Sequence, residues 1–136
     1  MECVCPVVNT DQLPATFQIL RQFLPTILRS KCFNDENKPF FREVLQTEVG
    51  HLFEHMLLEY MCKIKVSRGL RKVCVSGVTN WNWRRERYGT FNITIRVGRE
   101  ESEIFLEAFN RSMNLFNVIL NSSFISFPPK TDDILS

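Results

Sequence analysis

The two histidines of the chain lie one helical turn apart, in the run Gly50-His51-Leu52-Phe53-Glu54-His55. Positions i and i+4 share one face of a helix, so two imidazoles at this spacing can hold one metal ion. Glu54 is rotated from His55 by about 100° around the helix axis, which places its carboxylate beside such an ion. A carboxylate there can accept a proton from water and return it to a leaving amine. The H-x-x-E-H pattern therefore predicts a zinc site with His51 and His55 as ligands and Glu54 as catalytic base.

A catalytic zinc ion usually has three protein ligands and one open position, so a third ligand must come from elsewhere in the chain. The acidic candidates are Glu101, Glu103, Glu107 and Glu59. Glu59 lies one turn beyond His55 and is equally suited to orienting an imidazole from behind. The alternative interpretation is that both histidines are exposed or satisfied polar residues of an amphipathic helix, because a motif with three fixed positions often occurs by chance.

A second cluster interleaves aromatic and basic side chains, and its members are Trp81, Trp83, Arg84, Arg85 and Arg87. Arginines can grip carboxylates bidentately and indole rings can pack on a ligand, so this segment is a candidate substrate-binding loop. The alternative is a solvated hairpin loop whose tryptophans fasten it to the core. Nucleic-acid binding is not indicated, because no basic stripe extends the cluster and the net charge is only +2.

Composition places the chain among ordinary globular proteins, with 136 residues, 44% hydrophobic and 24% charged. No apolar run approaches the roughly 20 residues of a membrane-spanning helix, and the N-terminus lacks the pattern of a signal peptide. The five cysteines are scattered, without a C-x-x-C pair: Cys3, Cys5, Cys32, Cys62 and Cys74. An odd, scattered set indicates reduced thiols, so we expect a cytoplasmic protein. The oligomeric state does not follow from the sequence.

The helix that positions the histidines is expected at about 39–65, opened by Pro39 and dense in apolar residues on several faces. Such density is typical of a central, buried helix. Gly50 lies inside it, although a glycine within a helix costs about 0.5–1 kcal/mol relative to alanine. We therefore expect something to approach the helix closely there, either a neighbouring strand or a substrate.

The remaining elements follow from periodicity and from turn residues. Before the histidines, we expect a short strand at 3–8, a helix at about 12–29 that Pro25 kinks or breaks, and a polar loop at 30–38. After them, we expect strands at 72–79 and 90–97, paired as a hairpin with a long loop, and a helix at about 101–120. Residues 121–136 form either a tail or a last short strand at 124–127. The whole chain, 1–136, is expected to be one α+β domain of order β-α-α-β-β-α, with helices on one face of a small antiparallel sheet.

Around the histidines, the chain resembles the N-terminal domain of cyanophycin synthetase. The Gly-His-x-x-Glu-His core at 50–55, continued by Leu58-Glu59, carries most of this resemblance. Over about 20–120, further features occur in the same order as in that family. They are Leu24-Pro25, Cys32, Phe40 or Phe41, then Arg84, Arg85 and Arg87, then a strand led by Gly89 and the acidic pair Glu100-Glu101. The loop at 81–87 departs from the family, whose version is richer in glycine and threonine.

This resemblance implies an α+β domain related to the pitrilysin-like metallopeptidase fold and a metal-dependent hydrolytic site. Inverted zincins of the pitrilysin type take their third ligand from a glutamate on a later helix, which favours Glu101, with Glu103 and Glu107 as alternatives. In some synthetases the domain cuts cyanophycin, a poly-aspartate with arginine side groups, so the implied substrate is a peptide or polyamide. Because the ATP-dependent ligase parts are absent from this sequence, polymer synthesis is not expected. The competing hypothesis is a non-catalytic module that anchors a charged polymer or peptide through residues 81–87.

Overall fold

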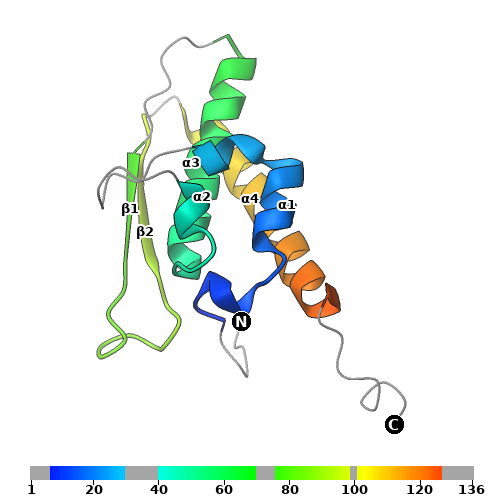
Figure 1. Ribbon diagram of the computed structural model, residues 1–136. Coiled ribbons are helices and arrows are strands. Elements are labelled where there is room, and N and C mark those ends of the chain that lie inside the picture. The colour runs from blue at the N-terminus through cyan, green and yellow to red at the C-terminus, as the bar shows by residue number, and fades with distance from the viewer. Residues whose placement is uncertain (1–6, 30–39, 70–75, 99–100, 127–136) are drawn as a thin grey trace.

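The computed structural model describes residues 7–29, 40–69, 76–98 and 101–126, and these form an α+β arrangement of helices with one two-stranded antiparallel sheet (Figure 1). Its elements are η1 (Thr10–Gln12), α1 (Thr16–Phe23), η2 (Pro25–Arg29), α2 (Phe40–Glu43), α3 (Val49–Ser67), β1 (Ser76–Asn80), β2 (Asn92–Arg96) and α4 (Ser102–Ser126). None of the described helices has the length and apolar character needed to cross a membrane.

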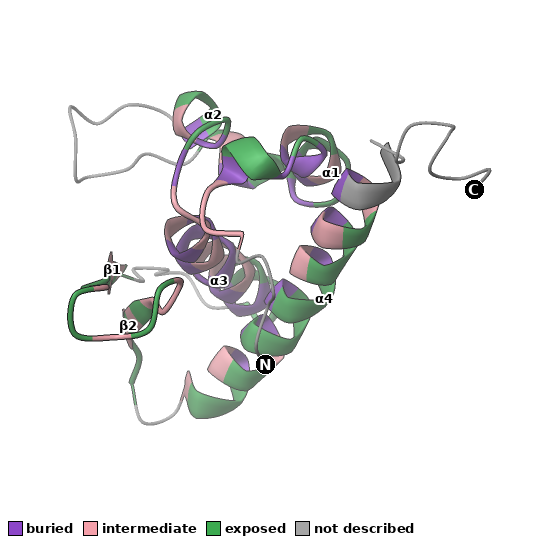
Figure 2. Ribbon diagram, turned by 90° about the horizontal axis from the view of Figure 1, so that it is seen from below, coloured by how far each residue is buried: buried purple, intermediate pink, exposed green. Residues whose placement is uncertain are grey.

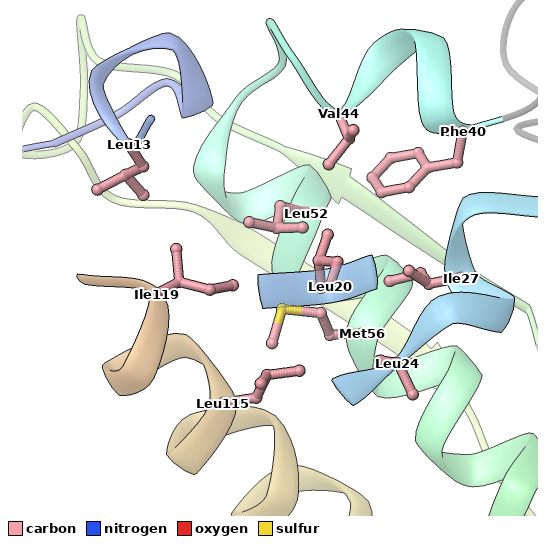
Figure 3. Close-up of a cluster of buried hydrophobic side chains, with 10 residues drawn as sticks. All are labelled: Leu13, Leu20, Leu24, Ile27, Phe40, Val44, Leu52, Met56, Leu115 and Ile119. Carbon is pink, nitrogen blue, oxygen red and sulfur yellow. The ribbon is translucent and has the colours of Figure 1, made fainter. Parts of the chain in front are cut away.

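Helix α3 is the central element, as its apolar density predicts. In two views at right angles it lies between the β1–β2 hairpin on one side and helices α1 and α4 on the other (Figures 1 and 2). One cluster of buried side chains joins α3 to the surrounding helices and turns: Leu13, Leu20, Leu24, Ile27, Phe40, Val44, Leu52, Met56, Leu115 and Ile119 (Figure 3). Burial of such side chains is the main favourable term in folding, so α3 is held on most of its circumference.

The helix expected at 12–29 is divided at Pro25, as predicted. Helix α1 ends at Phe23, and the chain continues from Pro25 as the short 3-10 helix η2. Pro25 has no N–H to continue the α-helical ladder, which is the physical reason for the break. Both pieces still contribute buried side chains to the core, Leu20 from α1 and Ile27 from η2.

The single helix expected at 39–65 is wrong, because the structure has two helices, α2 and α3, separated by residues 44–48. Backbone groups between them bond to the N-terminal segment instead of to a helix: Thr10 N–H donates to the carbonyl of Thr47 at 2.8 Å, and Val49 N–H donates to that of Val8 at 2.8 Å. These partners are about 40 residues apart in sequence, so no local pattern shows them. The break places His51 in the first turn of α3.

The hairpin is confirmed, with β1 and β2 antiparallel and Thr79 opposite Ile93. Residues 81–91 form its long loop. A Cβ added to Gly50 would lie 2.4 Å from the ring of Phe91, the residue just before β2. Phe91 is therefore the close neighbour that Gly50 led us to expect. Residues 70–75, at the start of the strand expected at 72–79, lie outside the described part.

Both ends of the described chain differ from expectation. Helix α4 runs to Ser126, beyond the expected end at 120, and 124–126 are therefore helical rather than a strand. Of the strand expected at 3–8, only Val7 and Val8 are described, and neither is in a strand; the nearby pairing is a single bridge between Asn9 and Glu48. The whole of the loop expected at 30–38, with the Cys32 match, lies outside the described residues.

Candidate functional site

His51 and His55 point their ε nitrogens at each other across one turn of α3. The two Nε2 atoms lie 3.1 Å apart, and the ring planes are at 81°. Two donors of a tetrahedral zinc ion, each about 2.0–2.1 Å from the metal, are separated by about 3.3 Å. The two imidazoles therefore already have nearly the spacing that one shared ion requires.

The ring of Phe40, the first residue of α2, holds the histidine pair from one side. It stacks on His55 with ring centroids 4.0 Å apart and an interplanar angle of 12°, and it meets His51 edge-on. His55 is only 7% exposed. Burial, followed by the neighbouring His51, lowers the pKa of His55 to about 3. His55 is thus a neutral imidazole at physiological pH, which is the form that binds metals.

Thr47 lies within hydrogen-bond distance of one ring nitrogen of His51. Its hydroxyl donates to the Glu48 carboxylate at 3.3 Å and lies 2.9 Å from Nδ1 of His51. Because that hydroxyl has a single proton, we assign the proton of the second bond to Nδ1 of His51, which then donates to Thr47. Nε2 of His51 is left as an acceptor, and His55 donates to it through its Nε2–H. That proton would have to leave Nε2 of His55 before both nitrogens could bind one ion. Metal-ligating histidines commonly have their second nitrogen held by an oxygen in this way.

Glu54 faces the hairpin rather than α2. The Thr79 hydroxyl of β1 donates to Oε1 of Glu54 at 2.6 Å, and Glu54 is 4% exposed. Gly77 of β1 also faces Glu54: a Cβ there would lie at an ordinary contact distance of 3.4 Å from Cγ of Glu54, and 2.6 Å from Cδ1 of Ile95 on the paired strand β2. The carboxylate and the imidazoles thus occupy neighbouring faces of one helix, as the motif spacing predicts.

The acidic residues expected to supply a third ligand are engaged elsewhere. Glu101 accepts from Lys65 and from the Gly98 N–H, and the bond from Lys65 is the largest reason that the pKa of Glu101 is lowered. Lys65 lies about 20 Å along the axis of α3 from His51, at 1.5 Å per residue. The acidic first turn of α4 therefore meets the far end of α3, away from the histidines.

The other candidates do not complete the site either. Glu107 pairs with Arg68 at 3.1 Å and with Arg111 at 2.7 Å. Glu103 is exposed on the first turn of α4, and Glu59 is half-buried on α3. Within 7–29, 40–69, 76–98 and 101–126, no group of three histidine, cysteine, aspartate or glutamate side chains is placed to hold a metal. Of the ligands predicted from the sequence, the described residues bring only His51 and His55 together.

The hairpin loop carries the aromatic and basic cluster, and Trp83 holds this loop through a hydrogen bond and ring contacts. Trp83 donates its indole N–H to the Thr90 carbonyl at 3.0 Å and packs against Tyr88 and Phe91. Trp83 therefore fastens the loop, while Trp81 remains 40% exposed. Arg84, Arg85 and Arg87 are exposed. Phe91 rests on Gly50, so the loop emerges beside the end of α3 that carries the histidines.

Three residues that shape this site were given no role in it from the sequence: Phe40, Thr47 and Thr79. Of these, Phe40 entered only through the family resemblance. Thr47 lies four residues before His51, but its role depends on the helix break that tertiary contacts create. Thr79 is a polar residue on the half-buried face of β1 and could have been noticed from strand alternation. Comparisons with models of protein families, with curated proteins and with solved structures found no match.

Proposed function

We propose that the protein is a zinc-dependent hydrolase of peptide or isopeptide bonds, acting on a charged polyamide of the cyanophycin kind. One observation carries this proposal: the Nε2 atoms of His51 and His55 lie 3.1 Å apart on a buried helix. The neutral state of His55 and the hold of Thr47 on Nδ1 of His51 support it, because both favour metal ligation.

Each residue of the motif has a distinct role in this proposal. Zinc, when bound, polarises the scissile carbonyl and lowers the pKa of water. His51 and His55 are two of the three protein ligands that a catalytic zinc usually has. Glu54 accepts the proton of the attacking water and passes it to the leaving amine. Thr79 keeps Oε1 of Glu54 in place, which leaves Oε2 to carry the proton.

The loop at 81–87 is the proposed substrate contact. Arg84, Arg85 and Arg87 are exposed, and guanidinium groups bind carboxylates bidentately. The exposed face of Trp81 offers a surface for the aliphatic part of a ligand. A polymer that carries free carboxylates fits this loop better than a neutral peptide does.

A Glu54→Gln variant separates metal binding from chemistry. We expect it to keep the zinc content of the wild type, measured by atomic emission, and to lose about 10²–10⁴-fold in hydrolysis of cyanophycin or an isopeptide reporter. Glu43→Gln on α2 is the matched control and should keep both properties. Purified protein without stoichiometric zinc, and unchanged by His51→Ala, would contradict the proposal.

A second candidate function is a non-catalytic module that anchors a charged polymer through residues 81–87. The exposure of all three arginines on an ordered loop favours it. Polymer binding that survives His51→Ala and is lost in Arg85→Ala, without hydrolysis by the wild type, would select this function over the first.

A further inference from the structure

A pocket lies between α1, α3 and α4, on the side of α3 that faces away from the hairpin. Its volume is about 290 Å³, and its lining residues are Phe23, Tyr60, Arg111, Asn114, Leu115 and Val118. The histidine pair and Glu54 are not among them. A volume near 300 Å³ is at the lower end of the range for small-molecule sites.

Each polar side chain that lines this pocket can donate a hydrogen bond, and none of the six lining residues is acidic. Arg111 brings a guanidinium group, Tyr60 a phenol and Asn114 an amide. Burial raises the pKa of Tyr60, while the positive charge of Arg111 nearby opposes that rise, so the phenol is protonated at neutral pH and close to the guanidinium. Three donors at one site favour an anionic acceptor.

The rest of the lining is apolar and partly uncovered. Phe23 is 51% exposed at the end of α1, and Val118 is 39% exposed on α4, whereas Leu115 forms a buried floor at 5%. Exposed apolar surface next to a few convergent polar groups is typical of a ligand site. Covering Phe23 and Val118 would remove apolar area from water, which favours binding.

Arg111 already pairs with Glu107 at 2.7 Å, but this ion pair does not use all the N–H donors of the guanidinium group. The side chains are 50% and 36% exposed, and such surface pairs contribute little. Only one guanidinium nitrogen, Nη2, is bonded to Glu107. A guanidinium has five N–H donors, so Arg111 can bind a second carboxylate while it keeps the first.

We propose that this pocket binds a small organic carboxylate with an apolar body. Arg111 and Tyr60 bind the carboxylate, and Phe23 and Val118 cover the body. This ligand differs from the proposed polymer substrate, and its site does not include the metal ligands. The proposal therefore stands or fails independently of the zinc site.

The test uses 3-phenylpropionate as the probe and neutral 3-phenylpropionamide as its partner, titrated into the full chain by NMR. We expect saturable binding of the acid with a Kd on the order of 1 mM or tighter, and binding of the amide weaker by about tenfold or more. The shifted resonances should include Phe23 and Val118.

Variants then assign the contacts. Arg111→Gln and Tyr60→Phe should each weaken binding of the acid, the first by about tenfold, while Arg42→Gln on α2 should match the wild type. Zinc content should be unchanged in all three, which separates this pocket from the metal site. Equal binding of acid and amide, wild-type affinity in Arg111→Gln, or no saturation by the acid would each overturn the proposal.

Discussion

At the scale of single residues, Thr47 is as informative as the histidines. Its hydroxyl lies between the Glu48 carboxylate and Nδ1 of His51, and the tautomer that we assign from these two bonds leaves Nε2 of His51 as the acceptor that faces His55. This makes a chain of hydrogen bonds from Glu48 to His55 that orients both rings for the proposed metal. Preorganisation of this kind lowers the cost of binding.

Replacement of Thr47 by valine should weaken zinc binding by about 10–100-fold, because His51 loses the oxygen that orients its ring. The measurement is competition for zinc against a chromophoric chelator. Thr94→Val, at an exposed position of β2, removes the same hydroxyl away from the site and should have no effect. Wild-type affinity in Thr47→Val would show that the hydroxyl does not orient the ligand.

The buried, neutral state of His55 predicts a pH dependence of stability in the zinc-free protein. Its pKa is about 3 in the folded protein, against 6.5 as the ordinary value. Between these values the unfolded chain binds a proton that the folded chain does not, so the free energy of unfolding falls on acidification from pH 6.5. The slope reaches at most about 1.4 kcal/mol per pH unit.

Urea denaturation from pH 7 to pH 5 measures this slope, with His55→Gln as the reference. The variant lacks the titrating ring, so its stability relative to the wild type should improve as the pH falls. Parallel curves for the two proteins would show that His55 is protonated as easily in the folded state as in the unfolded state.

At the scale of elements, the contact between α3 and the hairpin depends on a small residue, Gly50, which receives the ring of Phe91. Gly77 gives room to Ile95 within the hairpin and lies in ordinary contact with Glu54. These contacts place the hairpin beside the motif and bring Thr79 within 2.6 Å of the Glu54 carboxylate. The packing of two elements, rather than the motif alone, thus positions the proposed catalytic base.

Gly50→Ala should destabilise the protein by about 1–3 kcal/mol, although alanine is the better helix former. The added Cβ would lie 2.4 Å from the ring of Phe91, so the hairpin must shift. Urea denaturation measures the effect. In a Phe91→Ala background the same change should be neutral or stabilising, since the obstructing ring is gone; equal costs in both backgrounds would contradict this explanation.

At the scale of the whole molecule, α3 separates two surfaces with different chemistry. The side that faces α2 and the hairpin carries the histidine pair, Glu54 and the arginine loop, while the side that faces α1 and α4 carries the pocket of Tyr60 and Arg111. Figure 2 shows this central position of α3 between the hairpin and the other helices. A helix buried on both sides can support two sites that act independently.

Contacts between sequence neighbours were predictable from the sequence alone. The period of α3 brings His51 and His55 together because residues i and i+4 of any helix share a face. Alternation at 90–97 indicates β2 and its hairpin, and Pro25 ends a helix because it has no N–H to donate. The proposed chemistry of the H-x-x-E-H motif therefore follows from residue types and spacing, without knowledge of the surrounding elements.

Tertiary packing decided the contacts between distant segments. The break before α3 depends on the hydrogen bond between Thr10 and Thr47. The position of Glu101 depends on which end of α3 is approached by α4. The pocket combines Phe23, Tyr60 and Arg111 from three helices. Each of these contacts joins residues more than 30 positions apart, and their free energies come from burial and from hydrogen bonds that exist only once the helices pack. Residue types and spacing thus determined the histidine pair, and the arrangement of the helices decided which groups surround it.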